Sequence, residues 1–277
     1  MKRILSTVVV LFSLLGIGNA QYLEVGVFGG ASNYAGDLQF KTLEDKEINA
    51  AYGAFARYNI SKHFAVRLQA LATKISGSDL NARASNPLRS RNLSFETSII
   101  ELALMGEVNV FGFDVRDKRG SSFFIFGGVG GARFNPKAEL LGISYDLQPL
   151  GTEGQTLGGS SPYKLFTLSI PAGIGAKLSI SNKLNVSLEY GVRITMTDYL
   201  DDVSTTYPDL DALRALDPVA AALSYRTMEI DSGANPNPFG EARGNAGNKD
   251  RYMIGALTIS YNLATKKSME YDEKYKW

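Results

Sequence analysis

Two of the side-chain types that most often catalyse reactions, histidine and cysteine, are nearly or wholly missing from this chain. His63 is the only histidine, and cysteine is absent, which excludes thiolate sites, disulfides and a lipid-modified N-terminal cysteine. His63 lies in the short polar stretch 61–63, with no base and orienting group around it, so we interpret it as a turn residue. We therefore expect no catalytic residues and predict that the protein is not an enzyme.

A run of carboxylates is the strongest candidate for a metal site. Asp198, Asp201 and Asp202 are followed by Asp209 and Asp211. Their spacing does not match the Asp/Asn, Gly and Glu pattern of a dedicated calcium loop. We interpret them as a solvated acidic rim, and we expect no metal and no other cofactor.

Eight further charged residues occupy the polar positions of segments that alternate with aliphatic residues. They are Glu24, Glu101, Glu107 and Glu189, and Arg57, Arg67, Lys177 and Arg193. If these positions face the inside of a closed sheet, lone charges would be costly to desolvate, whereas paired charges are tolerated. The alternatives are a selective charged pore and a network that fills the interior. The network is favoured, because eight strands enclose little more space than their own side chains occupy.

The elements that carry these charges are predicted to be long β-strands. In residues 184–196 one face is Leu, Val, Leu, Tyr, Val, Ile and Met, and the other is mostly polar, with one Gly. Such alternation indicates a strand with one apolar face. Strands are expected at about 22–30, 52–60, 64–73, 94–110, 122–134, 168–180, 184–196 and 251–263. Eight is the smallest common strand number for an outer-membrane barrel.

The connections between these strands alternate in length. Residues 31–49, 75–93, 135–164 and 198–250 form long connections, and 61–63, 111–121 and 181–183 form shorter ones. This is typical of barrels with short periplasmic turns and long extracellular loops. The predicted fold is an all-β, eight-stranded antiparallel up-and-down transmembrane β-barrel, with its aliphatic positions facing lipid; a soluble lipocalin-like barrel or sandwich is the alternative.

Two local features refine this prediction. Leucines at 210, 213 and 216, followed by Asp217 and Pro218, predict two short helices between about 209 and 226 in the last loop. Aromatic residues near strand ends are candidates for interfacial girdles. They are Tyr58, Phe64, Phe111, Phe113, Phe123, Phe134 and Tyr261.

The N-terminus has the features of a secretory signal peptide. Lys2 and Arg3 precede an apolar run that ends in the small residues before position 21, so residues 1–20 are expected to be cleaved after Ala20. The mature chain then carries 27 basic and 28 acidic residues, because two of the 29 basic residues are lost, and no basic excess exists to bind nucleic acid. The predicted organisation is a signal peptide (1–20), a barrel (21–263) and a periplasmic tail (264–277).

Three stretches together resemble a known family. They are YLEVGVFGGASNYAGDL at 22–38, RYNISKHFAVR at 57–67 and TDYLDDVSTTY at 197–207. The chain is similar in these stretches to the PorG-like outer-membrane β-barrel family of the type IX secretion system. The resemblance implies a non-enzymatic barrel that anchors a periplasmic ring, built from a lipoprotein and a partner protein, to the outer membrane; it supplies no catalytic residues.

Two function classes follow from these observations. The first is a structural secretion component, whose partners are outer-membrane lipid and the periplasmic ring proteins, with Tyr271, Tyr275 and Trp277 of the tail as a possible contact. The second is a stand-alone surface protein, an adhesin or ligand binder, that acts through loop 198–250. No nucleic acid or small-molecule substrate is expected for either class.

Overall fold

The computed structural model describes residues 23–40, 44–114, 120–158 and 161–263. The predicted signal peptide and the predicted tail, with Tyr271, Tyr275 and Trp277, lie outside these residues. Among the residues described, no helix is long and apolar enough to cross a membrane.

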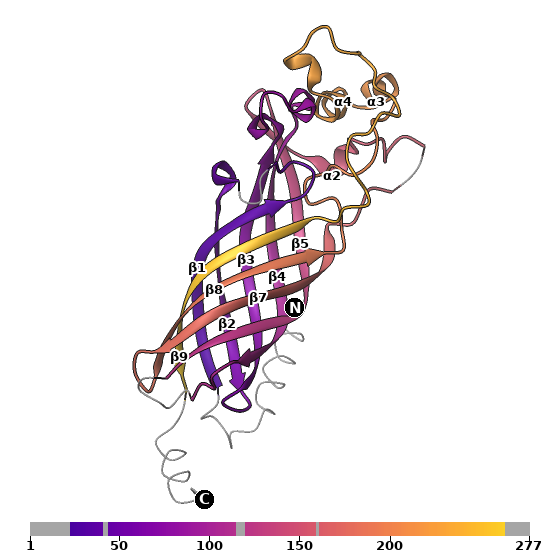
Figure 1. Ribbon diagram of the computed structural model, residues 1–277. Coiled ribbons are helices and arrows are strands. Elements are labelled where there is room, and N and C mark those ends of the chain that lie inside the picture. The colour runs from indigo at the N-terminus through magenta and orange to yellow at the C-terminus, as the bar shows by residue number, and fades with distance from the viewer. Residues whose placement is uncertain (1–22, 41–43, 115–119, 159–160, 264–277) are drawn as a thin grey trace, which may run out of the picture.

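Eight antiparallel strands form a closed barrel (Figure 1). They are β1 (Leu23–Ala35), β2 (Asn49–Asn59), β3 (Phe64–Ser78), β4 (Ser94–Asn109), β5 (Ser121–Leu140), β7 (Phe166–Ser179), β8 (Leu184–Thr195) and β9 (Arg251–Asn262). Each strand pairs with the next along the chain, and β1 pairs with β9 to close the sheet. The predicted fold class is therefore confirmed.

Short connections lie at one end of the barrel and long connections at the other (Figure 1). The long connections contain short elements. These are η2 (Asp45–Glu47), η3 (Asp79–Asn81), η4 (Pro87–Arg91), β6 (Ile143–Asp146), α2 (Leu147–Leu150), α3 (Leu210–Leu216), α4 (Pro218–Ser224) and η5 (Thr227–Glu229). The two helices predicted in the last loop are present, and Asp209 and Asp217 cap them by accepting hydrogen bonds from the backbone amides that follow.

The strand β5 is longer than predicted. It continues to Leu140 and forms a hairpin with β6 inside the segment expected to be a loop. Pro136 lies in this extension, where β5 has already left β7 and has not yet met β6. A proline is tolerated in a strand where one side has no neighbour to receive a backbone N–H.

The two faces of the strands differ sharply in chemistry. Aliphatic residues point outward along all the barrel strands and are well exposed, such as Leu102 (58%) and Leu188 (64%). The aliphatic positions of residues 184–196 face outward, as predicted. A contiguous apolar surface of this kind is not sustained by a soluble monomer and marks contact with another apolar phase.

Bulky rings fit the narrow interior because glycines face them. An alanine at Gly173 of β7 would place its Cβ 2.5 Å from Cζ of Phe126, and one at Gly175 would lie 2.4 Å from Cζ of Phe124. Two predicted girdle residues are also inside, so that prediction is wrong for them. Phe134 is on the inward face of β5. Phe113 lies in the connection between β4 and β5 and is buried, and Nζ of Lys177 lies 5.3 Å from its ring centroid.

Candidate functional site

Ionised side chains from six strands meet inside the barrel. The structure places all eight predicted lumen charges at inward positions, each at most 8% exposed. They are Glu24 on β1, Arg57 on β2, Arg67 on β3, Glu101 and Glu107 on β4, Lys177 on β7, and Glu189 and Arg193 on β8. Strand parity alone brings them together, because every second residue of a strand points into the lumen.

Glu107 is the centre of the network near the short-turn end. Its carboxylate lies 3.0 Å from Nε of Arg57, 3.1 Å from Nε of Arg67 and 2.9 Å from Nζ of Lys177. Three cations thus converge on one buried acid. Loss of this carboxylate would leave them facing one another in a medium of low dielectric constant.

Two other acids complete the charge balance around the arginines. Glu24 lies 2.9 Å from Nη1 of Arg57 and accepts hydrogen bonds from Asn59 (3.2 Å) and from Ser260. Glu189 lies 2.6 Å from Nη1 of Arg67. Each guanidinium therefore bridges carboxylates from different strands.

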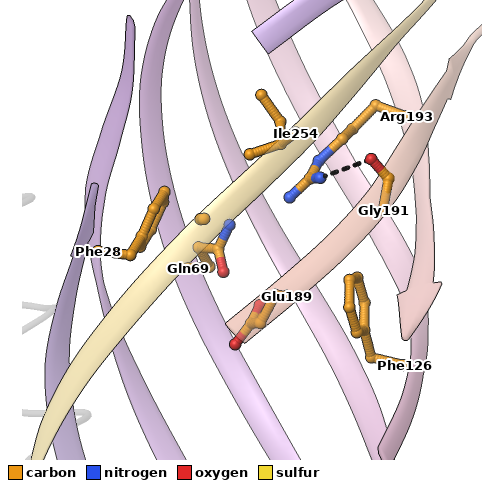
Figure 2. Close-up of a pocket in the computed structure, with 8 residues that line it drawn as sticks. Phe28, Gln69, Phe126, Glu189, Gly191, Arg193 and Ile254 are labelled. Atoms are coloured by element: carbon orange, nitrogen blue, oxygen red, sulfur yellow. Dashed lines mark hydrogen bonds between the residues drawn. The ribbon is translucent and has the colours of Figure 1, made fainter. Parts of the chain in front are cut away.

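A second, smaller group lies nearer the long-loop end. Arg193 is 3.8 Å from Glu101, which accepts hydrogen bonds of 2.7 Å from the hydroxyls of Tyr252 and Ser169. Arg193 also donates to the backbone carbonyl of Gly191 (3.3 Å), as Figure 2 shows. Neutral hydroxyls from β7 and β9 here supplement the ion pair.

Aromatic rings fill the space between the charges. Cζ of Arg67 lies 5.5 Å from the ring centroid of Phe55 and 5.1 Å from that of Phe126, and Nζ of Lys177 lies 4.3 Å from that of Phe124. These are cation–π distances, so the rings stabilise the buried cations as well as occupying volume.

Little free volume remains in the lumen. Gln69, Glu189 and Arg193 are among the residues that line a cavity there, drawn as sticks in Figure 2. The volume of this cavity is about 10 Å³. That is the room for a single water molecule. The arrangement is a packed polar core, and the geometry is that of a plug rather than a conduit.

The predicted acidic rim is wrong for its first three residues. Asp198, Asp201 and Asp202 are 2%, 1% and 0% exposed, whereas Asp209 and Asp211 are exposed. The segment 197–204 lies at the centre of a polar assembly made by the described residues of the four long connections, 36–40 and 44–48, 79–93, 141–158 and 161–165, and 196–250, which we call the cap. For Asp201 and Asp202, residues distant in the chain supply hydrogen-bond partners that compensate burial.

One tyrosine joins two of the buried carboxylates in the cap. The hydroxyl of Tyr34 is 2.6 Å from Oδ2 of Asp201 and 2.8 Å from Oδ1 of Asp250. The other oxygens accept from the backbone amides of Val203 (2.9 Å) and Leu200 (2.8 Å). Burial raises the pKa of both aspartates well above the usual value, and for Asp201 repulsion by Asp250 adds to it. Because a phenol has one proton, both contacts are hydrogen bonds only when one carboxyl is protonated and donates to the phenol.

Arg243 and Asp202 connect the third and fourth long connections. Asp202 accepts hydrogen bonds from Thr152 and from the hydroxyl of Tyr163 (2.5 Å), and Nη2 of Arg243 lies 3.7 Å away. Burial raises the pKa of Asp202 to about 6, although Arg243 opposes this shift. Arg243 also lies 3.1 Å from Glu153. The partners come from segments that are far apart in sequence.

Arg91 connects the first, second and fourth long connections. It binds Asp79 through two parallel contacts of 2.8 and 2.7 Å, and it donates to the backbone carbonyls of Asp37 (3.1 Å) and Arg243 (2.5 Å). Bidentate arginine–carboxylate pairs fix geometry as well as contribute energy. The cap is therefore one connected structure and not four independent loops.

Comparison with known families gives a single assignment. A family model described as a domain of unknown function, DUF6089, matches residues 2–218. The chain belongs to this family. Among curated proteins, no sequence matches the DUF6089 chain significantly.

Several solved structures are similar in chain course to this DUF6089 barrel. The attachment invasion locus protein Ail of Yersinia pestis, in complex with the heparin analogue sucrose octasulfate, is 10% identical with a TM-score of 0.39, over 86% of this chain and 97% of that one. Neisserial surface protein A is 9% identical with a TM-score of 0.37, over 87% and 96%. The outer membrane protein OprG of Pseudomonas aeruginosa is 9% identical with a TM-score of 0.36, over 86% and 94%.

The chemistry-bearing side chains of the DUF6089 barrel take up the following positions. His63 lies in the turn between β2 and β3, where its Nδ1 is 3.1 Å from the backbone carbonyl of Asn109. Within the described ranges, no group of three or more His, Asp or Glu residues is placed to hold a metal ion. The buried acids and bases instead neutralise one another.

Sequence reasoning missed the residues that hold the cap of this DUF6089 protein together. Tyr34 contacts carboxylates 167 and 216 residues away, and Arg91 and Arg243 lie in segments without periodicity. Only the density of Asp, Tyr and Thr in residues 197–207 signalled a polar centre.

Proposed function

We propose that this DUF6089 chain is a non-enzymatic outer-membrane β-barrel that serves as a structural component of the type IX secretion system. In this role it anchors the periplasmic ring, made of a lipoprotein and a partner protein, to the outer membrane. The observation that carries the proposal is a closed barrel that is apolar outside and filled by paired charges inside.

The outer surface supports the membrane location. The barrel strands are 11 to 20 residues long, whereas strands of globular domains are usually about five or six residues long. A tilted strand of such length crosses the apolar layer of an outer membrane, about 25 Å tall. Removing the exposed aliphatic residues from water also supplies the free energy of insertion.

The filled lumen supports a structural role over transport. A passage for solutes needs an open path, and the Glu107 cluster and the aromatic rings occupy this one. What such a barrel offers to other proteins is a fixed position in the membrane and two differently shaped ends.

The secretion assignment rests on the sequence resemblance. Of the three stretches that carry it, 22–38 contains β1 and enters the cap, 57–67 forms the first short turn, and 197–207 is the centre of the cap. Two of them thus contribute to the cap and one to the short-turn end, the end that faces the periplasm in this proposal.

Removal of the predicted tail tests the secretion role. A chain lacking residues 264–277 is expected to insert normally but to lose the periplasmic ring proteins in pull-down and to reduce export of secreted cargo. A matched control shortens the segment 231–238, most of which is exposed, at the opposite end, and this variant is expected to retain the ring proteins. Unchanged ring capture and export by the tail deletion would overturn the anchoring role.

A stand-alone surface protein is the second candidate, and the connected cap favours it. An adhesin or ligand binder needs a pre-organised outer surface, which the Arg91 and Arg243 networks provide. In that case the 231–238 deletion, and not the tail deletion, would change adhesion or ligand binding by the cell.

A further inference from the structure

A border between apolar and basic side chains crosses the outward face of β3, β4, β5 and β7. Strand register defines three rows there. The row within the apolar surface is Ala72, Ile100, Arg133 and Phe166; the next is Lys74, Ser98 and Asn135; the third is Ser76, Glu96, Lys137 and Asp146. Lys164 lies two residues before Phe166 on the same outward face.

Arg133 occupies an unusual position in this border. Its cross-strand neighbours are Ile100 and Phe166, which are 66% and 58% exposed, and below them Leu102 and Leu168 continue the apolar surface. An arginine at the edge of an apolar layer extends its guanidinium toward the polar boundary. An anion at that boundary would stabilise it.

The border contains four basic residues, Lys74, Arg133, Lys137 and Lys164. The protein supplies an anionic partner for only two of them. Lys74 pairs with Glu96 (2.6 Å) and Lys137 with Asp146 (3.1 Å). Within the part of the chain that the structure describes, the side chains of Arg133 and Lys164 have no hydrogen-bond or ion-pair partner, and both residues are exposed. The border therefore carries four basic residues against two acidic ones.

We propose that Arg133 and Lys164, with Lys74 and Lys137 beside them, bind the phosphate monoester of a phosphorylated glycolipid in the outer leaflet. The inference rests on the proposed function, because it needs the long connections to face outward. The border then lies at headgroup depth, with Ile100 and Phe166 against the acyl chains below. A monoester carries more negative charge than a phosphodiester, and the guanidinium of Arg133 can bind two of its oxygens.

Lipid retention by the full-length barrel tests the proposal. The protein is inserted into vesicles of phosphatidylcholine containing a few per cent of either bis-phosphorylated lipid A or its dephosphorylated form, then extracted in mild detergent, and bound glycolipid is measured by mass spectrometry. We expect the wild type to retain the phosphorylated form at least about tenfold better, because each basic residue at an anionic surface favours binding.

Matched variants separate the border from general charge. Arg133→Gln with Lys164→Gln is expected to reduce the preference to less than about twofold, while both exposed positions leave folding intact. The control, Lys62→Gln with Lys183→Gln, removes two exposed basic residues at the short-turn end and is expected to keep the preference. Equal retention by all three proteins, or an equal loss in the control, would overturn the proposal.

Insertion into vesicles of pure phosphatidylcholine distinguishes the two levels of inference. Insertion is monitored by the heat-dependent gel mobility that folded barrels show. A wild type that does not insert contradicts the proposed function and this inference with it. A wild type that inserts without preferring the phosphorylated lipid contradicts this inference alone, as does a border variant that loses a protein partner but keeps the lipid.

Discussion

Replacement of Glu107 by glutamine tests whether the lumen charges act as a balanced unit. The change preserves size and one hydrogen-bond acceptor, but it leaves the cations of Arg57, Arg67 and Lys177 with one acid fewer. Removing one partner from a buried charge pair costs about 3–5 kcal/mol. Because the glutamine oxygen still accepts a hydrogen bond, we expect the lower end of this range, about 3 kcal/mol.

A double variant turns this expectation into a measurement of coupling. Lys177→Met in the Glu107→Gln background restores equal numbers of acids and bases, while Arg57 keeps Glu24 and Arg67 keeps Glu189. We expect the double variant to be more stable than the sum of the two single variants by about 0.5–3 kcal/mol, the usual coupling for residues in contact.

Urea unfolding in phospholipid vesicles, followed by gel mobility, supplies the free energies. Lys177→Met alone serves as the control for loss of the lysine. The reasoning is refuted if Glu107→Gln changes stability by less than about 1 kcal/mol, or if the double variant is as unstable as the sum of the single variants.

Three further outcomes are expected. The reconstituted protein should show no stable single-channel current in planar bilayers, since the lumen cavity holds about one water molecule, and a porin-sized conductance would contradict this. Leu104→Arg, near the middle of the apolar part of β4, should destabilise the barrel in vesicles by about 2–4 kcal/mol, as a charge near the centre of a lipid face does, whereas a cost below about 0.5 kcal/mol would argue for an aqueous surface. The cap should become more sensitive to protease as pH rises: the raised pKa values of Asp201 and Asp250 mean that the folded state holds protons that the unfolded chain releases near pH 4, so stability is full below that pH and falls as pH rises toward the raised pKa values. Asp250→Asn should flatten this dependence, because its amide donates to Tyr34 without a titrating proton, and an unchanged pH profile would contradict the shared-proton arrangement.

The barrel was predictable from sequence because its signals are local and periodic. Alternation in residues 184–196 identifies the lipid-facing side of β8, and the same parity places Glu189 and Arg193 inside. Pairing partners within the lumen were not predictable, since inward residues from six strands meet across a closed sheet. Alternation alone would have placed Phe134 correctly. Like Phe124 and Phe126, it occupies an even-numbered position of β5, and these positions face the interior.

The cap was not predictable by the same means. A run such as Asp198 to Asp202 is usually solvated, and nothing near it in sequence indicates the partners that bury it. Those partners are Tyr34, Thr152, Tyr163 and Arg243, each supplied by another part of the chain. The hairpin of β5 and β6 was missed because Pro136 resembles the end of a strand.

The seam between β1 and β9 has a consequence for how the protein is made. The register pairs Glu24 with Asn262, and the side chain of Ser260 donates to Glu24 across the join. Until residues near 260 have been synthesised, β1 and β8, the two strands that pair with β9, each keep an unsatisfied hydrogen-bonding edge, and such edges promote aggregation. Closure of the barrel is thus the last strand pairing available to the nascent polypeptide. A holding chaperone that binds the apolar, unpaired strands before membrane insertion would protect the chain from aggregation until its first and last strands pair.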